Sequence, residues 1–141
     1  MTTLAIDKAR DFQLGEFEDY PVIASDIIYE GAAVGENASG YSRPLAAGDV
    51  FQGFALRKAD NSAGAAGAIN VTVRTRGRVK LPIASLAVTA NDRAAVYASD
   101  DDTFTLTAST NSLIGYVSRW VETGVAIVEF DAALVRAALQ A

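Results

Sequence analysis

The chain has 141 residues, half of them apolar, and a formal net charge of −5 at pH 7. This length suits a single domain with a core of its own. Cysteine and histidine are absent, which excludes disulfides, thiolate metal sites, thiol nucleophiles and a Ser-His-Asp triad. No pair of carboxylates stands out for glycoside hydrolysis. We therefore expect a protein that is not an enzyme, with no catalytic residue, no metal site and no cofactor.

The sequence lacks any run of about 18–20 apolar residues, the length that a membrane-spanning helix requires. The N-terminus carries charges at Asp7, Lys8 and Arg10, where a signal peptide needs an apolar block. We expect a soluble protein that is made in a cytoplasm and has no membrane partner.

Segment 1–30 carries the whole formal charge, because seven acids minus two bases give −5 and the rest of the chain is balanced. We predict that residues 1–25 form an acidic N-terminal arm. One interpretation is a solvated leader. We favour an arm that docks on a basic surface, because a purely solvating tail rarely contains aromatic residues. Its predicted apolar anchors are Phe12, Leu14, Phe17 and Tyr20.

Residues 26–141 read as one β domain, because short apolar or alternating runs recur between turn residues. The predicted strands lie in 26–34, 50–56, 69–83, 93–98, 103–107, 113–121 and 125–130. Asp131 is placed to cap a C-terminal helix over residues 132–140. The fold class expected is mainly β, a small β-barrel or β-sandwich-like domain with an extended N-terminal arm and a short C-terminal helix.

The sequence also contains a candidate internal repeat. Segment 31–62 aligns without a gap on segment 93–124. Gly53 then falls on Gly115, and Arg57 on Arg119. Chance matching in a chain rich in alanine and glycine is one explanation. The other is a duplicated β unit whose two copies close together into one barrel, which removes free sheet edges.

Strand 69–83 places a row of cations on one face, because strand side chains alternate between faces. Same-face residues lie about 6.6–6.8 Å apart, so the row is about 20 Å long. Carboxylates of the same subunit, such as Glu129 or Glu122, are one source of neutralising charge. Nucleic acid is another, but the chain is acidic overall and lacks a nucleic-acid motif. We favour the acidic arm of a neighbouring copy or the surface of a larger partner. This basic ridge consists of Arg74, Arg76, Arg78 and Lys80.

The C-terminal half carries a recognisable order of motifs. Val96-Tyr97 precedes the acidic turn Asp100–Asp102, and the threonine-rich run Thr103–Thr107 and the pair Ile114-Gly115 follow. Together with an alternating closing strand at Val125–Phe130, this order resembles the capsid decoration (cement) proteins of tailed phages. The resemblance covers residues 26–130. The acidic arm before Asp26 and the helix after Phe130 depart from it.

The resemblance implies a non-enzymatic protein on the outer capsid surface of a virion, made in the host cytoplasm, which stabilises the expanded head. Its implied partners are the major capsid protein and two further copies of itself in a homotrimer, with no nucleic acid. Two alternatives remain open. One is another phage structural subunit, such as a tail-tube or head–tail joining protein. The other is a carbohydrate-binding β domain that uses Tyr20 and Tyr41.

Overall fold

The computed structural model describes residues 5–10 and 15–140. The described chain is mainly β, with one short C-terminal α-helix, as expected. The first half contains β1 (Phe17–Pro21), β2 (Asp26–Ile28), β3 (Ala33–Glu36), β4 (Ser42–Pro44), β5 (Val50–Ala55), β6 (Ala59–Asn61) and β7 (Asn70–Arg74). The second half contains β8 (Arg76–Pro82), a 3-10 helix (Val88–Asp92), β9 (Ala95–Ala98), β10 (Phe104–Thr105), β11 (Ser112–Glu122), β12 (Val125–Asp131) and α1 (Ala132–Gln140).

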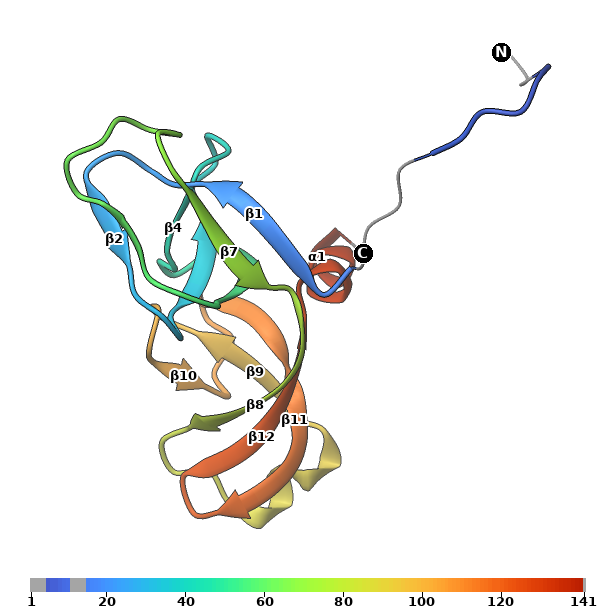
Figure 1. Ribbon diagram of the computed structural model, residues 1–141. Coiled ribbons are helices and arrows are strands. Elements are labelled where there is room, and N and C mark those ends of the chain that lie inside the picture. The colour runs from blue at the N-terminus through green and yellow to red at the C-terminus, as the bar shows by residue number, and fades with distance from the viewer. Residues whose placement is uncertain (1–4, 11–14, 141) are drawn as a thin grey trace.

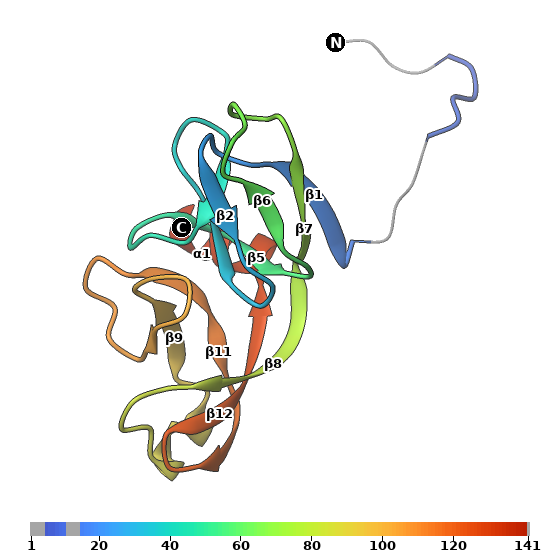
Figure 2. The same cartoon turned by 60° about the vertical axis from the view of Figure 1, so that its left-hand side comes forward.

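Two five-stranded antiparallel sheets form the body, one above the other in Figure 1. The strand order of the first sheet is β1-β7-β5-β3-β4, and that of the second is β8-β12-β11-β9-β10. The chain passes directly from the first sheet to the second between β7 and β8, and Figure 2 shows this crossing from the side. A small sheet of β2 and β6 covers the first sheet, and the strands curl as in a half-barrel.

The pairing of strands repeats between the two aligned segments, 31–62 and 93–124. In the first sheet Val34 pairs with Gly53, and in the second Val96 pairs with Gly115. Each register has its irregularity directly beside this pair. The two sheets are therefore built to the same plan across the two segments.

Two equivalent glycines allow neighbouring strands to approach closely. A methyl group on Gly53 would collide with the carbonyl oxygen of Arg74, and one on Gly115 with that of Glu129. Gly53 also has a φ of 132°, which residues with a side chain rarely adopt. The aligned segments 51–54 and 113–116 thus both require a residue without a side chain at their third position.

The apolar residues are buried in two clusters. The small core lies between the first sheet and the small sheet of β2 and β6. It consists of Val22, Ile28, Ala32, Val34, Ala55, Ala59, Val71 and Val73. The large core joins the two sheets and helix α1, and its centre is a group of phenylalanines. The rings of Phe54 and Phe130 meet edge to face with centroids 4.9 Å apart. Phe51 and Phe104 flank this pair, at 5.5 Å and 6.1 Å from Phe54.

Helix α1 begins where the sequence predicts. The Asp131 carboxylate accepts hydrogen bonds from the backbone N–H groups of Ala133 and Leu134, at 3.0 and 3.2 Å. These bonds satisfy donors that the first helical turn leaves without an intrahelical partner. Across residues 5–10 and 15–140, no helix is both long enough and apolar enough to span a bilayer.

Three predicted boundaries are wrong. The predicted strand 26–34 is interrupted, because β2 ends at Ile28 and β3 begins at Ala33 in a different sheet. Residues 17–22, assigned to the arm, belong to the body, because β1 pairs with β7 along its whole length and Val22 is fully buried. The predicted strand 69–83 is two strands, because the chain leaves the first sheet at Thr75 and enters the second. Residues 5–10 are all exposed and run away from the body, as Figures 1 and 2 show.

We predict that Gly115→Ala lowers the free energy of unfolding by about 1–3 kcal/mol or more, because the added methyl group forces two strands apart. The control is Gly15→Ala, where a new Cβ meets nothing within 4 Å. It should change stability by less than about 0.5 kcal/mol. Urea unfolding measures both. Equal midpoints for the two variants would contradict the close approach of β11 and β12.

Deleting residues 1–14 should leave the melting temperature unchanged, since the described residues 5–10 are exposed. Deleting residues 1–25 should lower it by many degrees or prevent folding, because β1 and the buried Val22 are lost. Differential scanning calorimetry of the two truncated chains makes the comparison. A shared, unchanged melting temperature would show that β1 is dispensable.

Candidate docking surface

The cations of the basic ridge follow the end of β7 and the length of β8. Arg74, Arg76, Arg78 and Lys80 are all exposed, whereas Val73 and Leu81, next to its two ends, are buried. Within β7 and within β8 the exposed and the more buried positions alternate as predicted. Because the chain changes sheets at Thr75, the ridge crosses the junction between the two sheets.

One ridge cation is neutralised within the subunit. The Arg78 guanidinium contacts the Glu129 carboxylate at 3.1 Å, directly across from it on β12. The other carboxylate oxygen of Glu129 accepts a hydrogen bond of 2.7 Å from the Tyr116 hydroxyl. The hydrogen bonds from Tyr116 and Arg78 lower the pKa of Glu129. The bond between Tyr116 and Glu129 also raises the pKa of Tyr116. Of the two predicted intrasubunit partners, Glu129 forms the ion pair; within the described chain Glu122 forms none.

Arg74 is engaged without an ion pair. Its guanidinium lies over the ring of Phe17, 5.4 Å from the centroid, and its Nε donates to the carbonyl oxygen of Arg76 at 3.3 Å. A guanidinium over an aromatic face is a favourable cation–π arrangement. The structure thus brings one predicted arm anchor, Phe17, onto the predicted basic ridge. Arg76 and Lys80 form no ion pair within the described residues.

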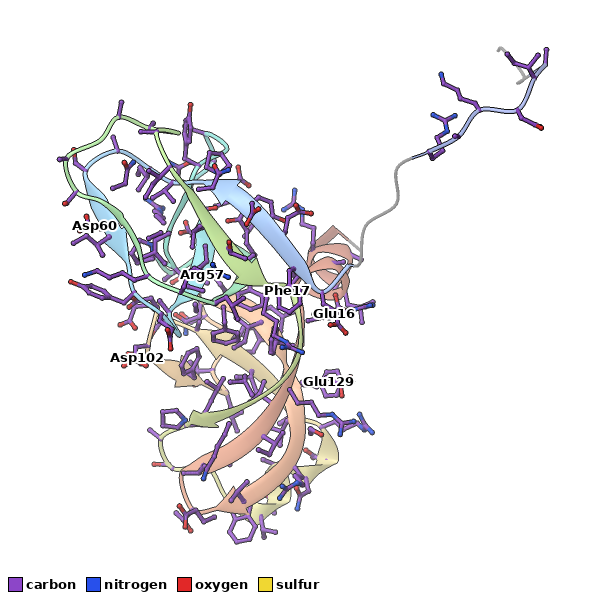
Figure 3. The ribbon with its side chains drawn as sticks, viewed as in Figure 1. Glu16, Phe17, Arg57, Asp60, Asp102 and Glu129 are labelled. Atoms are coloured by element: carbon purple, nitrogen blue, oxygen red, sulfur yellow. The ribbon has the colours of Figure 1, made fainter. Side chains whose placement is uncertain are left out.

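The N-terminal arm is fastened at the same place. The backbone N–H of Thr75 donates to the carbonyl oxygen of Glu16 at 2.8 Å, and the Thr75 hydroxyl donates to that of Gly15 at 2.7 Å. Figure 3 shows Glu16 and Phe17 close together beside α1, with Glu129 nearby on β12. A shallow hollow of about 250 Å³ is lined by Glu16, Arg74, Arg76, Gly77, Arg78, Glu129, Phe130 and Asp131.

The remaining arm anchors are placed differently. Tyr20 lies half-buried on β1 and packs against the small core, so it is a sheet residue and not a free anchor. Phe12 and Leu14 lie outside the described residues. The ridge and residues 15–16 of the arm together form one surface that carries both charges. Its acidic residues are Glu16, Glu129 and Asp131, and its basic residues are Arg74, Arg76 and Arg78.

A second polar hollow lies at the acidic turn. Tyr29, Glu30, Asp101 and Asp102 are among its lining residues, and burial, followed by the nearby Asp100, raises the pKa of Asp101. Lys58 lies over the Tyr29 ring at 5.3 Å. In residues 5–10 and 15–140 no group of acidic side chains is arranged to hold a metal ion.

Sequence reasoning missed a third feature, an apolar groove between α1 and the second sheet. Leu113, Tyr116, Phe130 and Leu134 are among its lining residues. The apolar stripe of α1 was visible in the sequence, but which strand it meets was not. In comparisons with known proteins, no family model, no curated protein and no solved structure matches the chain.

The lowered pKa of Glu129 predicts a specific pH dependence. Its stabilising effect is present above the usual carboxylate range near pH 4.5 and is lost as the pH falls through the lowered value. Glu129→Gln should therefore destabilise the protein at pH 7 and have little effect at pH 2. Urea unfolding at both values measures this. Glu122→Gln, at an exposed position without an ion pair in the described chain, should be neutral at both. A constant deficit for Glu129→Gln at both values would contradict the ionic role.

Proposed function

We propose that the chain is a structural protein of a tailed-phage virion, which binds the outer surface of the capsid and stabilises the expanded head. The observation that supports this most strongly is the basic ridge beside the root of the arm. In the described residues Arg78 has an ion-pair partner and Arg74 lies over the Phe17 ring, whereas Arg76 and Lys80 have no ion-pair partner and can meet acidic groups of another protein. The resemblance of residues 26–130 to decoration proteins points the same way.

The energetics of decoration suit such a surface. A protein that binds only the assembled lattice stabilises that lattice by mass action. Each exposed ion pair contributes only about 0.2–1 kcal/mol, so one subunit binds weakly through its ridge. Several subunits joined in a homotrimer bind together, and their avidity exceeds that of each single contact. Phe12 and Leu14 are the proposed apolar contacts of the arm with the shell.

The alternatives find less support. The glycan-binding hypothesis relied on Tyr20 and Tyr41, and both side chains are half-buried, with Tyr20 against the small core. A tail-tube or head–tail joining subunit shares the β-rich composition, and the basic ridge does not separate it from a decoration protein. Binding to heads as opposed to tails is therefore the decisive property.

The double substitution Arg76→Glu with Lys80→Glu tests the role of the ridge. Both residues are exposed and neither forms an ion pair in the described chain. Because Arg76 lies opposite Asp131 on β12, the thermal melt of the variant is measured beside its binding, and a cooperative melt shows that the variant is folded. Binding to expanded heads should fall by at least about tenfold at physiological salt, because attraction becomes repulsion. Co-sedimentation with heads at several salt concentrations measures it, and wild-type binding should weaken as salt rises.

The matched control is Arg57→Glu with Arg119→Glu, which makes the same change of charge at exposed cations outside the ridge. Equal losses for both double variants would mean that net charge alone governs binding. Undiminished binding of the ridge variant would show that the ridge does not face the shell.

A further inference from the structure

The apolar groove beside α1 differs from the hollows at the basic ridge and at the acidic turn in its mainly apolar lining. It has a volume of about 250 Å³. Strands β9 and β11 form one wall, and the exposed face of α1 forms the other. Leu134 at the groove is 63% exposed, although it is a large aliphatic residue. The lining residues are Ala95, Leu113, Gly115, Tyr116, Glu129, Phe130, Asp131, Leu134, Val135 and Ala138.

The repeat between the two sheets shows that this face is covered in one unit and open in the other. In the first sheet the corresponding positions are Ala33, Phe51 and Phe54, which are 0%, 2% and 7% exposed. The aromatic residues of the second sheet cover them. At the equivalent positions the second sheet carries exposed Ala95 and half-buried Leu113 and Tyr116. In the second sheet, therefore, no aromatic residues of another sheet cover the face that is covered in the first sheet.

The size of the groove favours a side chain over a small-molecule ligand. Sites for drug-sized ligands and cofactors span about 300–1,000 Å³, and this groove lies below that range. Acidic groups stand at one end of it, at Glu129 and Asp131. An occupant with an aliphatic side chain followed by basic residues would match both the apolar walls and the charged end.

Residues 5–10 of the chain itself have this composition. Ile6 is 81% exposed. Lys8 and Arg10 outnumber Asp7, so the segment has a net charge of +1. An aliphatic side chain with this exposure gains about 1.5–3 kcal/mol if it is fully buried. Ile6 thus matches the apolar lining of the groove, and Lys8 and Arg10 match its acidic residues.

The position of the arm indicates whether residues 5–10 bind the groove of their own chain or that of another copy. The arm leaves the body at Gly15, which Thr75 holds, and Thr75 accepts a hydrogen bond from the first residue of α1, Ala132. Residues 5–10 lie away from the body in both views (Figures 1 and 2). The stretch of chain from Gly15 back to Ile6 spans at most about 30 Å when fully extended, which reaches an adjacent molecule.

We propose that the groove beside α1 binds the N-terminal segment of a second copy of the chain, with the Ile6 side chain between Leu113 and Leu134. Lys8 and Arg10 then lie towards Glu129 and Asp131. Each copy gives an arm and receives one, so the contacts close as a reciprocal exchange between two copies or as a ring of more copies. It links copies to one another and does not depend on binding to a capsid.

The absence of native cysteine allows a direct test. One full-length chain carries Ala5→Cys, which leaves the Ile6 side chain in place, and a second, distinguished by a mass tag, carries Ala95→Cys, an exposed position in the groove. Mixed and oxidised in the absence of heads, they should form a disulfide-linked heterodimer, because a disulfide requires Cα atoms within about 7 Å. The control replaces Ala95→Cys by Ala87→Cys, an exposed alanine that does not line the groove.

We expect the heterodimer with Ala95→Cys to form at least about tenfold faster than with Ala87→Cys, because docking raises the effective concentration. Equal rates for the two positions would overturn the proposal. A single chain that carries both Ala5→Cys and Ala95→Cys provides the second measurement. If it closes a disulfide within itself and forms no covalent oligomer, the arm occupies its own groove and the proposal fails. Since no capsid is present, neither result depends on the proposed function.

Discussion

The edge-to-face contact between Phe54 and Phe130 connects the two halves of the chain, and most other features follow from it. Phe54 belongs to the first sheet and Phe130 to the last strand of the second, so their contact packs one sheet on the other. This packing requires the strands beneath the rings to lie close together, which the glycines at 53 and 115 allow. Close to this packing the chain crosses between the sheets at Thr75, which also binds Gly15 and Glu16 of the arm.

Local patterns predicted a large part of the structure. The alternation around Arg74–Lys80, the cap at Asp131 and the turn between β11 and β12 depend on near neighbours, so the sequence contains them. Strand β1 could not be predicted in this way. Its sequence, Phe17–Pro21, is acidic and shows no alternation of apolar residues, and it forms a strand because β7, which is distant in the sequence, offers a free edge. The apolar groove likewise depends on where α1 packs.

The two units share a plan but have different surroundings, and this asymmetry produces the surfaces that are open to partners. In the first unit both faces of the sheet are covered, one by β2 and β6 and the other by the second unit. The second unit has one face in the large core and the other only partly covered by α1. The partly open face of the second sheet is the surface to which we propose that the N-terminal segment of another copy binds. Three cations of the ridge, Arg76, Arg78 and Lys80, lie on β8, which is an edge strand of the second sheet.

Cryo-electron microscopy tests the central claim most directly, with the full-length chain added to expanded heads assembled from the major capsid protein of the same genome. The account predicts extra density on the outer surface, arranged as rings of β bodies with β8 facing the shell. It also predicts that the density disappears when the heads are washed at high salt. Heads that show no added density under saturating, low-salt conditions would contradict it.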